Sequence, residues 1–239
     1  MNSKLSGLVK KILINGVGKE RLKRIALNKK ERILIRLQDD EYLRKNNFEK
    51  SYLQESGWLE SAISGKIVDE NGLPLPWLTL PFIHFLEPRL QKRFHIFEYG
   101  SGYSTLFYAS RVKTIYAVEH DREWYEKVKQ DLPENATIFH EKLEENGDYS
   151  KKSNRIGELF DLIIIDGMDR VNCCFNAPKS LSENGVIILD NSNRPEYKKG
   201  IEYLLGLGFK NIDFTGMAPR SPQLSCTSIY YRINNCLSI

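Results

Sequence analysis

Short apolar runs of strand length alternate with stretches of helical periodicity over most of the chain after residue 90. The most continuous run, Phe160–Ile165, has the composition of a central parallel strand that is buried on both faces. The strands expected from such runs are 95–99, 114–118, 136–140, 160–165 and 186–189. The helices expected between them are 103–111, 121–132, 171–181 and 195–205. This alternation is typical of an α/β domain with a mostly parallel sheet.

Both ends of the chain depart from this alternation. Two further strands, 211–215 and 227–232, are joined without a helix, through a loop that contains Pro219 and Pro222. At the other end, residues 1–57 are charged and carry apolar residues at helical intervals, which predicts a helical N-terminal extension. The domain would therefore span residues 58–239, with 58–93 as a segment that caps it. In that segment, Trp77 is expected to stack on a ligand or to pack as an anchor.

Composition and charge fit one α/β domain with an appendage, since the chain has 239 residues and a net charge of only +4. Basic residues dominate residues 1–30, where Glu20 is the one acid. This favours a solvated helix and leaves peripheral membrane contact, oligomer formation and nucleic-acid binding open. No apolar stretch approaches the roughly 20 residues that span a bilayer. The four cysteines form no C-x-x-C, so free thiols in a cytoplasmic protein are expected.

A glycine turn follows the first predicted strand and precedes a predicted helix. Gly100 and Gly102 let a ligand lie close to the backbone, and the helix start offers unpaired N–H groups. Glu119, which ends the next strand, is placed to hold a ribose hydroxyl pair. A dinucleotide site would need a third glycine where Thr105 stands, so the sequence argues against an oxidoreductase of that type.

The run Glu98-Tyr99-Gly100-Ser101-Gly102 resembles motif I of the class I S-adenosylmethionine-dependent methyltransferases, and Ala117-Val118-Glu119 resembles their ribose-binding acid. The resemblance covers about residues 57–232. It implies a Rossmann-like methyltransferase fold: a mostly parallel seven-stranded sheet with helices on both faces and an antiparallel pair at one end. It also implies S-adenosylmethionine as the cofactor. The implied cofactor-binding residues are Glu98, Tyr99, Gly100, Ser101, Gly102, Ser104, Thr105, Glu119, His120 and Asp166.

Acidic residues end four of the predicted strands: Glu98, Glu119, Asp166 and Asp190. The carboxyl ends of parallel strands meet at the edge of a sheet where ligands bind. The segments IIIDG and IILDN resemble the divalent-cation site of catechol and caffeoyl-coenzyme A type O-methyltransferases, which implies Asp166, Asp190 and Asn191 as Mg²⁺ ligands. The alternative is that Asp166 touches cofactor or substrate while Asp190 and Asn191 cap the next helix.

Catalysis of O-methylation needs a group that accepts the proton of the hydroxyl. In the catechol-type enzymes a lysine stands three residues after the first metal-binding aspartate, and Asp169 occupies that position here. Asp169 is therefore one candidate for the base, unless Asp169 and Arg170 simply begin the next helix. His120 is another candidate because an unperturbed histidine titrates near neutrality. Together with Asp166, these are the expected catalytic residues.

The sequence thus predicts a methyltransferase that acts on a hydroxyl of a small molecule or glycan, with metal assistance left open. The glycan preference rests on segments similar to methyltransferase-like proteins of bacterial glycan pathways, namely WLTLP, FEYGSGYST and TSIYYR. A nucleic-acid methyltransferase is disfavoured, because the sequence after the fourth strand is Asp166-Gly167-Met168-Asp169 and not of the N-P-P-Y type. A non-catalytic cofactor-binding protein on the same fold remains an alternative.

Overall fold

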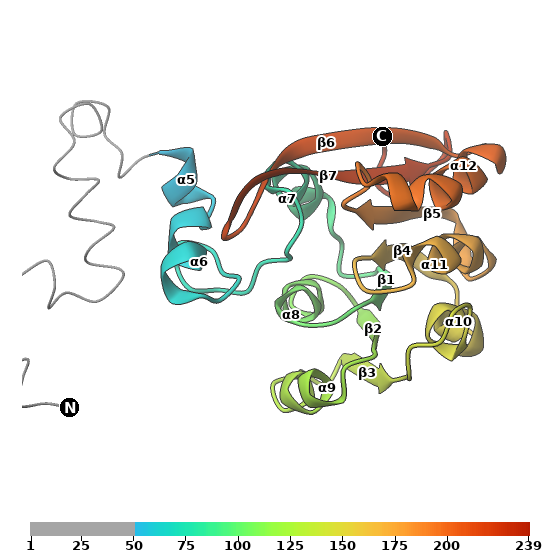
Figure 1. The fold of residues 1–239 in the computed structure, drawn as a ribbon, viewed down its shortest axis with the longest axis horizontal. Helices are drawn as coiled ribbons and strands as arrows, with labels where there is room; N and C mark the ends of the chain where they lie inside the picture. The colour runs from blue at the N-terminus through green and yellow to red at the C-terminus, as the bar shows by residue number, and fades with distance from the viewer. Residues whose placement is uncertain (1–50) are drawn as a thin grey trace, which may run out of the picture.

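A computed structural model describes residues 51–239. At its centre is a seven-stranded sheet in the order β3-β2-β1-β4-β5-β7-β6 (Figure 1). The strands are β1 (His95–Tyr99), β2 (Thr114–Glu119), β3 (Ala136–His140), β4 (Phe160–Ile165), β5 (Leu181–Asp190), β6 (Lys210–Ala218) and β7 (Ser221–Tyr231). Strands β1 to β5 pair in parallel, whereas β7 is antiparallel to both β5 and β6. The sheet is therefore mixed, and the predicted α/β fold with an antiparallel end is confirmed.

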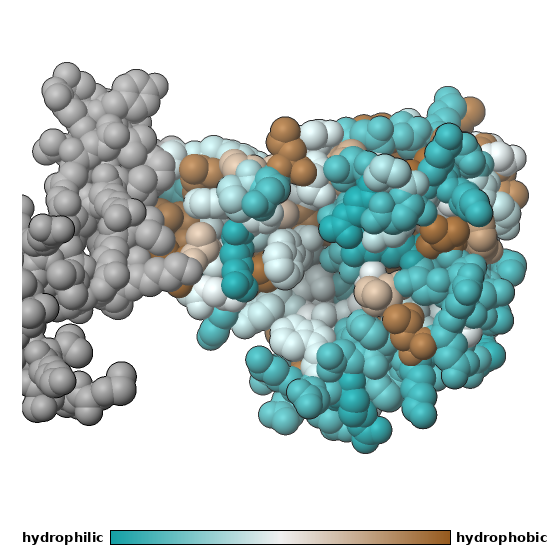
Figure 2. All heavy atoms as spheres, in the orientation of Figure 1, coloured by the Kyte–Doolittle hydropathy of each residue, from teal (hydrophilic) through white to brown (hydrophobic). Residues whose placement is uncertain are grey.

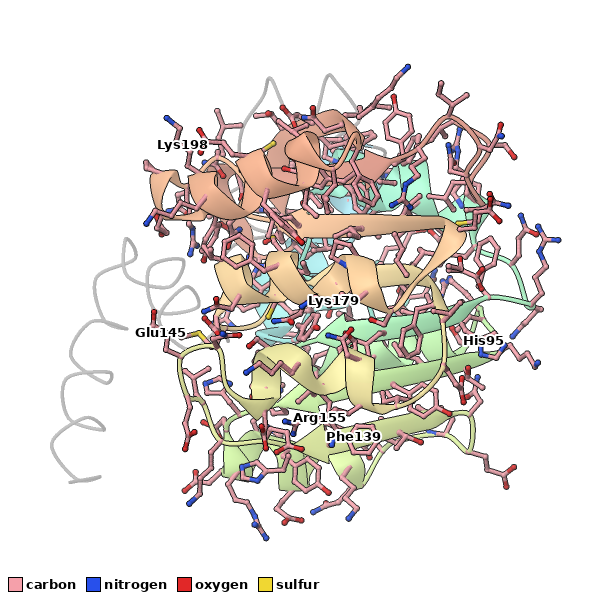
Figure 3. All side chains as sticks on the ribbon, turned by 90° about the vertical axis from the view of Figure 1, so that its right-hand side faces the viewer. His95, Phe139, Glu145, Arg155, Lys179 and Lys198 are labelled. Atoms are coloured by element: carbon pink, nitrogen blue, oxygen red, sulfur yellow. The ribbon has the colours of Figure 1, made fainter. Side chains whose placement is uncertain are left out.

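Helices cover both faces of this sheet. One face carries α7 (Leu80–Leu86), α8 (Tyr103–Ala109) and α9 (Arg122–Lys129). The other carries α10 (Asp148–Arg155), α11 (Arg170–Asn176) and α12 (Lys198–Gly206), which lie in front of the strands in Figure 3. The remaining elements are short: α5 (Tyr52–Glu55), α6 (Trp58–Ser64), and the 3-10 helices η2 (Glu87–Arg89), η3 (Ala177–Lys179) and η4 (Pro195–Tyr197).

The packing of strand β4 explains why its sequence is apolar at nearly every position. Leu162 and Ile164 pack into the core on the α7 and α8 side, and Ile163 and Ile165 pack into the core under α10, α11 and α12. All four side chains are at most 1% exposed. Successive side chains of a strand point to opposite faces, so a strand with helices on both sides needs apolar residues throughout.

The structure corrects two predicted boundaries. The helix expected over 171–181 ends at Asn176 and continues as η3, because Pro178 lacks the N–H that would extend it. The predicted loop through Pro219 and Pro222 is wrong, since β6 and β7 continue to a tight turn at Arg220, whose φ is 67°. Pro222 is tolerated because this part of β7 lies beyond the residues that pair with β5.

The predicted extension over residues 1–57 lies almost wholly outside the described residues, as do the membrane contact and oligomer formation attributed to it. The segment 58–93 packs onto the domain through α7, where the rings of Phe82 and Phe85 lie 5.3 and 4.7 Å from that of Phe214 on β6. Within residues 51–239, no helix has the length and apolar composition that crossing a membrane requires.

Candidate functional site

A cleft of about 900 Å³ lies at the carboxyl ends of β1, β2, β4 and β5. This face of the molecule is visibly hollowed (Figure 2). Each of the four strands contributes an acid to the lining of the cleft, namely Glu98, Glu119, Asp166 and Asp190. Glu98, Glu119 and Asp190 are at most 5% exposed. The expectation that the four acids meet at one edge of the sheet is therefore confirmed.

The glycine turn after β1 brings bare backbone to the cleft. Gly100 and Gly102 have φ angles of 103° and 153°, which residues with a side chain rarely adopt. A Cβ on Gly100 would lie 3.3 Å from Cα of Gly167, and a Cβ on Gly167 would lie 2.8 Å from the Gly100 nitrogen. The turns after β1 and β4 thus touch backbone to backbone. The sequence reading gave Gly167 no such role, because the contact joins residues far apart in the chain.

Glu98 lies at the bottom of the cleft and is 1% exposed. Its Oε2 accepts a hydrogen bond of 2.6 Å from the Thr105 hydroxyl, which in turn accepts one of 3.0 Å from the Gly102 N–H. Burial raises the pKa of Glu98 to about 7, against hydrogen bonds from Ser104 and Thr105 that lower it. The carboxyl group can therefore change charge near neutral pH.

Two residues expected to contact the cofactor are placed away from the cleft. Thr105 is fully buried and holds Glu98 instead of lining the cavity. The side chain of Tyr99 points to the opposite face of the sheet, where its hydroxyl donates to the Ser150 carbonyl at 2.9 Å. Glu98 and Tyr99 are neighbours on a strand, so their side chains must point to opposite faces. Neither side chain therefore reaches the cleft. Thr105 supports Glu98, and Tyr99 packs in the core on the other face of the sheet.

Glu119 links the glycine turn to the start of α9. Its Oε1 accepts hydrogen bonds from the backbone N–H groups of His120 and Asp121, at 2.8 and 2.9 Å, and its Oε2 accepts one of 3.0 Å from the Ser101 hydroxyl. The His120 Nδ1 also lies 2.8 Å from Glu119 Oε1. Glu119, Ser101, His120 and Ser104, which were predicted to bind the cofactor, all line the cleft. The Glu119 carboxylate is thereby fixed at the rim where β2 ends.

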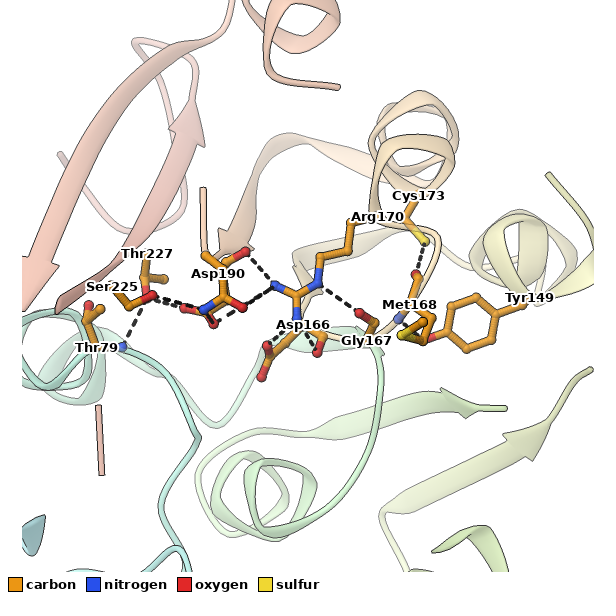
Figure 4. Close-up of polar contacts among 11 residues, drawn as sticks. Thr79, Tyr149, Asp166, Gly167, Met168, Arg170, Cys173, Asp190, Ser225 and Thr227 are labelled. Atoms are coloured by element: carbon orange, nitrogen blue, oxygen red, sulfur yellow. Dashed lines mark hydrogen bonds and ion pairs between the residues drawn. The ribbon is translucent and has the colours of Figure 1, made fainter. Parts of the chain in front are cut away.

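Arg170, which the sequence placed only at the start of a helix, lies among the acids of β4 and β5 (Figure 4). Arg170, only 8% exposed, forms an ion pair of 3.1 Å with Asp166 and donates hydrogen bonds to the main-chain oxygens of Asp190 and Gly167 at 2.5 and 2.8 Å. It also donates to Asn191 Oδ1 at 3.3 Å. The i, i+4 spacing of Asp166 and Arg170 was the signal in the sequence that could have indicated this pair.

Burial dominates the electrostatics of the two aspartates. It raises the pKa of Asp166 well above the ordinary value; the Asp190 charge raises it further and the Arg170 charge lowers it. Burial likewise raises the pKa of Asp190, although a hydrogen bond from Thr227 and the Arg170 charge oppose the shift. Burial therefore favours the neutral form of both carboxyl groups, and the Arg170 charge favours their ionised form.

The predicted metal site does not fit these contacts. Asp190 accepts hydrogen bonds at both oxygens, from the Thr227 hydroxyl and from Asn191 Nδ2, each at 2.6 Å. Asn191 Oδ1 and Asp166 already face the guanidinium of Arg170. No cluster of three or more His, Cys, Asp or Glu side chains among residues 51–239 is arranged to hold a metal ion. The cation in this place is the arginine, so these contacts do not support Mg²⁺ ligands at Asp166, Asp190 and Asn191, and that site stays a prediction.

Asp169 was one of the two residues predicted from the sequence to act as the base. It is not part of the cleft lining. It adopts a left-handed conformation with φ of 49° and precedes α11. Its Oδ2 accepts from the backbone of Asn146 and its Oδ1 accepts from the side chain of Asn172, at 3.0 and 2.7 Å. Asp169 therefore joins two loops. Of the three expected catalytic residues, Asp166 and His120 line the cleft and Asp169 does not.

The opposite wall of the cleft comes from segments that the sequence did not bring together. Trp77, 49% exposed, lies in the segment before α7. Arg194 follows β5, and Arg220 sits in the turn between β6 and β7. The turn is fixed to α6 by two hydrogen bonds, from the Trp58 indole to the Ser221 carbonyl and from Arg220 to the Gly65 carbonyl, both at 3.0 Å.

Comparison with known proteins gives structural likeness only. No family model matches the chain, and no curated protein matches it by sequence. An O-methyltransferase of tomaymycin synthesis from Streptomyces achromogenes, solved in complex with SAM, superposes with a TM-score of 0.52 at 15% identity, over 78% of this chain and 94% of its own. A precorrin-6y C5,15-methyltransferase from Geobacter metallireducens gives a TM-score of 0.51 at 14% identity, over 64% of this chain and 87% of its own.

An rRNA methylase from Streptococcus thermophilus gives a TM-score of 0.50 at 16% identity, over 64% of this chain and 96% of its own. The three proteins modify different kinds of molecule, so their likeness concerns the fold and not the acceptor. The described part of the chain has the fold of the class I S-adenosylmethionine-dependent methyltransferases, as the resemblance in its sequence implied.

Proposed function

We propose that the protein is an S-adenosylmethionine-dependent methyltransferase that methylates a hydroxyl group of a small molecule or glycan. The observation that carries this proposal is the meeting of the glycine turn with Glu119 in one large cleft at the carboxyl edge of the sheet. In this fold class, ligands bind where parallel strands end. The cleft is also large enough for a cofactor and an acceptor together, since small-molecule sites measure about 300–1,000 Å³.

The cleft residues fit the cofactor chemically. Gly100 and Gly102 leave room for a ligand against the backbone. The Glu119 carboxylate is immobilised by three hydrogen bonds and is available at the rim to accept from ribose hydroxyls. Acidic side chains at the ends of β1, β2 and β4 favour a ligand with a positive charge. When bound, the cofactor supplies a methyl group on a positively charged sulfur.

The protein's own residues must then orient the acceptor hydroxyl and take up the proton that it loses. We assign the role of proton acceptor to Asp166, because it lines the cleft and the Arg170 charge beside it favours the ionised carboxylate that can take up a proton. Arg170 keeps this carboxyl in place through its ion pair and its hydrogen bond to the Asp166 carbonyl, at 3.1 and 3.0 Å. His120 is held by Glu119 and lies on the cofactor side of the cleft, where we assign it a binding role.

Metal assistance at Asp166, Asp190 and Asn191 is not part of the proposal, because the guanidinium of Arg170 already supplies a positive charge to these side chains. The proton balance stays complete without it. A cofactor held by the glycine turn and Glu119 would supply the methyl group to the hydroxyl oxygen and keep the electron pair of its carbon–sulfur bond, and Asp166 would take the hydroxyl proton. Orientation of the two reactants supplies much of the rate in such a transfer.

A screen of hydroxylated acceptors with methyl-labelled S-adenosylmethionine tests this function. Asp166→Asn keeps the size of the side chain and removes the proton acceptor, so kcat is expected to fall at least about 100-fold with KM for the cofactor nearly unchanged. Glu158→Gln, an exposed acid outside the cleft, is the matched control and is expected to leave turnover unchanged. Label transfer to no acceptor, or full turnover by Asp166→Asn, would contradict the proposal.

A further inference from the structure

Apart from Arg170, which is paired with Asp166, the positive and negative side chains of the cleft lining lie on different walls. All its acidic lining residues come from the ends of β1, β2, β4 and β5 and from the cap of α9. The wall made by residues 65–77, the loop after β5 and the β6–β7 turn contributes Arg194 and Arg220 and no acid. The cofactor side and the acceptor side therefore differ in sign, and an acceptor with a negative group would be both attracted and oriented by them.

Arg194 lines the cleft with a side chain that is available to bind a ligand. Its side chain is exposed and forms no hydrogen bond or ion pair with any residue of the part that the structure describes. Its backbone is fixed, because its N–H donates to the Asn191 carbonyl at 2.9 Å. An arginine presents its donors in a planar fork that matches the oxygens of phosphate and carboxylate groups. Arg194 is thus free to bind such a group where β5 ends.

Arg220 is held by a side-chain hydrogen bond and is also available to bind an anion in the cleft. Its Nη1 donates to the Gly65 carbonyl at 3.0 Å, which anchors the guanidinium at the mouth of the cleft. The neutral carbonyl leaves the positive charge of Arg220 uncompensated, and the other nitrogens have no partner within residues 51–239. The positive φ of this residue, 67°, shows that the turn presents it at some conformational cost.

An aromatic face completes this wall. Trp77 is 49% exposed in the cleft although an indole is usually buried, and Ile67 and Leu75 lie beside it in the lining. Polar groups of Asn193 and Gln223 add hydrogen-bonding capacity on the same wall. A flat apolar surface with surrounding donors and acceptors suits a ring that carries hydroxyl groups.

We propose that the acceptor carries an anionic oxygen group, a phosphate or a carboxylate, which Arg194 and Arg220 bind while its ring lies against Trp77. This rests on the proposed function, since it names the acceptor class of the same cleft.

A small acceptor is favoured over a nucleic acid. Residues 1–50 contain 14 of the 35 basic and six of the 31 acidic residues, so residues 51–239 hold 21 basic and 25 acidic residues and have a net charge of −4. The cleft-bearing part of the chain therefore offers a long polyanion no net attraction, and the basic excess of the full chain lies in residues 1–50.

The first experiment titrates the full chain with inorganic pyrophosphate, with citrate and with neutral methyl glucoside, following heat by calorimetry at low ionic strength. Pyrophosphate and citrate stand for phosphate and carboxylate acceptors, and the tighter of them identifies the source of the anion. Arg194→Ala is expected to weaken binding of that anion about tenfold or more. Arg93→Ala removes an exposed arginine before β1, outside the cleft, and is expected to change nothing. Equal affinities in wild type and Arg194→Ala, or preference for the neutral glucoside, would overturn the proposal.

Arg220 needs a second variant because its bond to Gly65 also supports the wall. Arg220→Lys keeps the charge and loses the fork, and Arg220→Ala loses both. Anion affinity is expected to fall in the order wild type, Lys, Ala, while the melting temperature reports any loss of structure separately. A single-stranded RNA that binds the wild type more tightly than pyrophosphate, and Arg194→Ala equally well, would overturn the small acceptor in favour of nucleic acid.

The anion titration does not depend on the cofactor, so the two proposals fail separately. Wild-type protein that binds S-adenosylhomocysteine but no anion would overturn the anionic acceptor and keep the methyltransferase. Wild-type protein that binds an anion through Arg194 but no S-adenosylhomocysteine would overturn the proposed function and keep the anion site.

Discussion

Replacing Glu98 by Gln isolates the cost of ionising a carboxyl group beneath the cleft. Burial raises the pKa of Glu98 from 4.5 to about 7 in the folded protein. Between these values the folded state binds a proton that the unfolded chain releases, so the free energy of unfolding falls as pH rises. One pKa unit corresponds to about 1.4 kcal/mol, so Glu98 is expected to lower the stability by about 3 kcal/mol between pH 4.5 and pH 7.5.

Glu98→Gln removes this titration while keeping the hydrogen bond that its side-chain oxygen accepts from the Thr105 hydroxyl. Urea unfolding of both proteins at pH 5 and at pH 8 measures the effect. Asp166 and Asp190 also have raised pKa values and contribute to the slope of the wild type. The informative quantity is therefore the change in the free energy of unfolding between the two pH values, compared between wild type and variant. This change is expected to be smaller in the variant by about 3 kcal/mol.

Glu134→Gln is the matched control, because Glu134 is exposed, lies outside the cleft and forms no side-chain hydrogen bond or ion pair within residues 51–239. It is expected to keep the pH dependence of the wild type. If Glu98→Gln loses stability from pH 5 to pH 8 as steeply as the wild type does, Glu98 ionises without penalty, and the reasoning from its burial is wrong.

Two further substitutions test the interior of the cleft. Arg170→Met leaves buried carboxyls without their cation and is expected to cost about 3–5 kcal/mol at pH 8, as measured by urea unfolding. The loss is expected to be smaller at pH 5, because burial raises the pKa of Asp166 and lower pH favours its neutral form; an equal loss at both pH values would contradict this electrostatic role. Gly167→Ala would place a Cβ 2.0 Å from the Tyr149 hydroxyl oxygen and 2.8 Å from the Gly100 nitrogen. It is expected to lower stability by about 1–3 kcal/mol, of which Tyr149→Phe restores only a part; a neutral effect would refute the close packing of the two turns.

The fold was largely predictable because its signal is local. The apolar runs that become β1, β4 and the second half of β5 are buried on both faces, so each of these strands is marked by its own residues. The helix expected over 121–132 begins where Asp121, a residue type that favours the N-cap, accepts at Oδ1 from the Trp124 N–H at 2.8 Å. The β6–β7 turn was missed because Pro219 and Pro222 are ordinarily loop residues, and only the extent of β5 shows that β7 runs unpaired on that side.

The site was predictable only as far as sequence order determines position. Residues at the ends of parallel strands must meet at one edge, which located Glu98, Glu119, Asp166 and Asp190 correctly. The role of Arg170 was missed because it depends on how α11 packs beside β5, and that is a tertiary contact. The same holds for Arg194 and Arg220, which the fold brings to one wall from separate loops.

Calorimetric titration of the full chain with S-adenosylhomocysteine tests the central claim most directly. The wild type is expected to bind one molecule per chain. Glu119→Ala removes a charged acceptor, and each lost hydrogen bond to it is worth roughly 1.5–3 kcal/mol, so affinity is expected to fall at least about tenfold. Glu158→Ala, which removes an acid outside the cleft, is expected to bind as the wild type does. No binding by the wild type, or unchanged binding by Glu119→Ala, would contradict the assignment of this cleft to the cofactor.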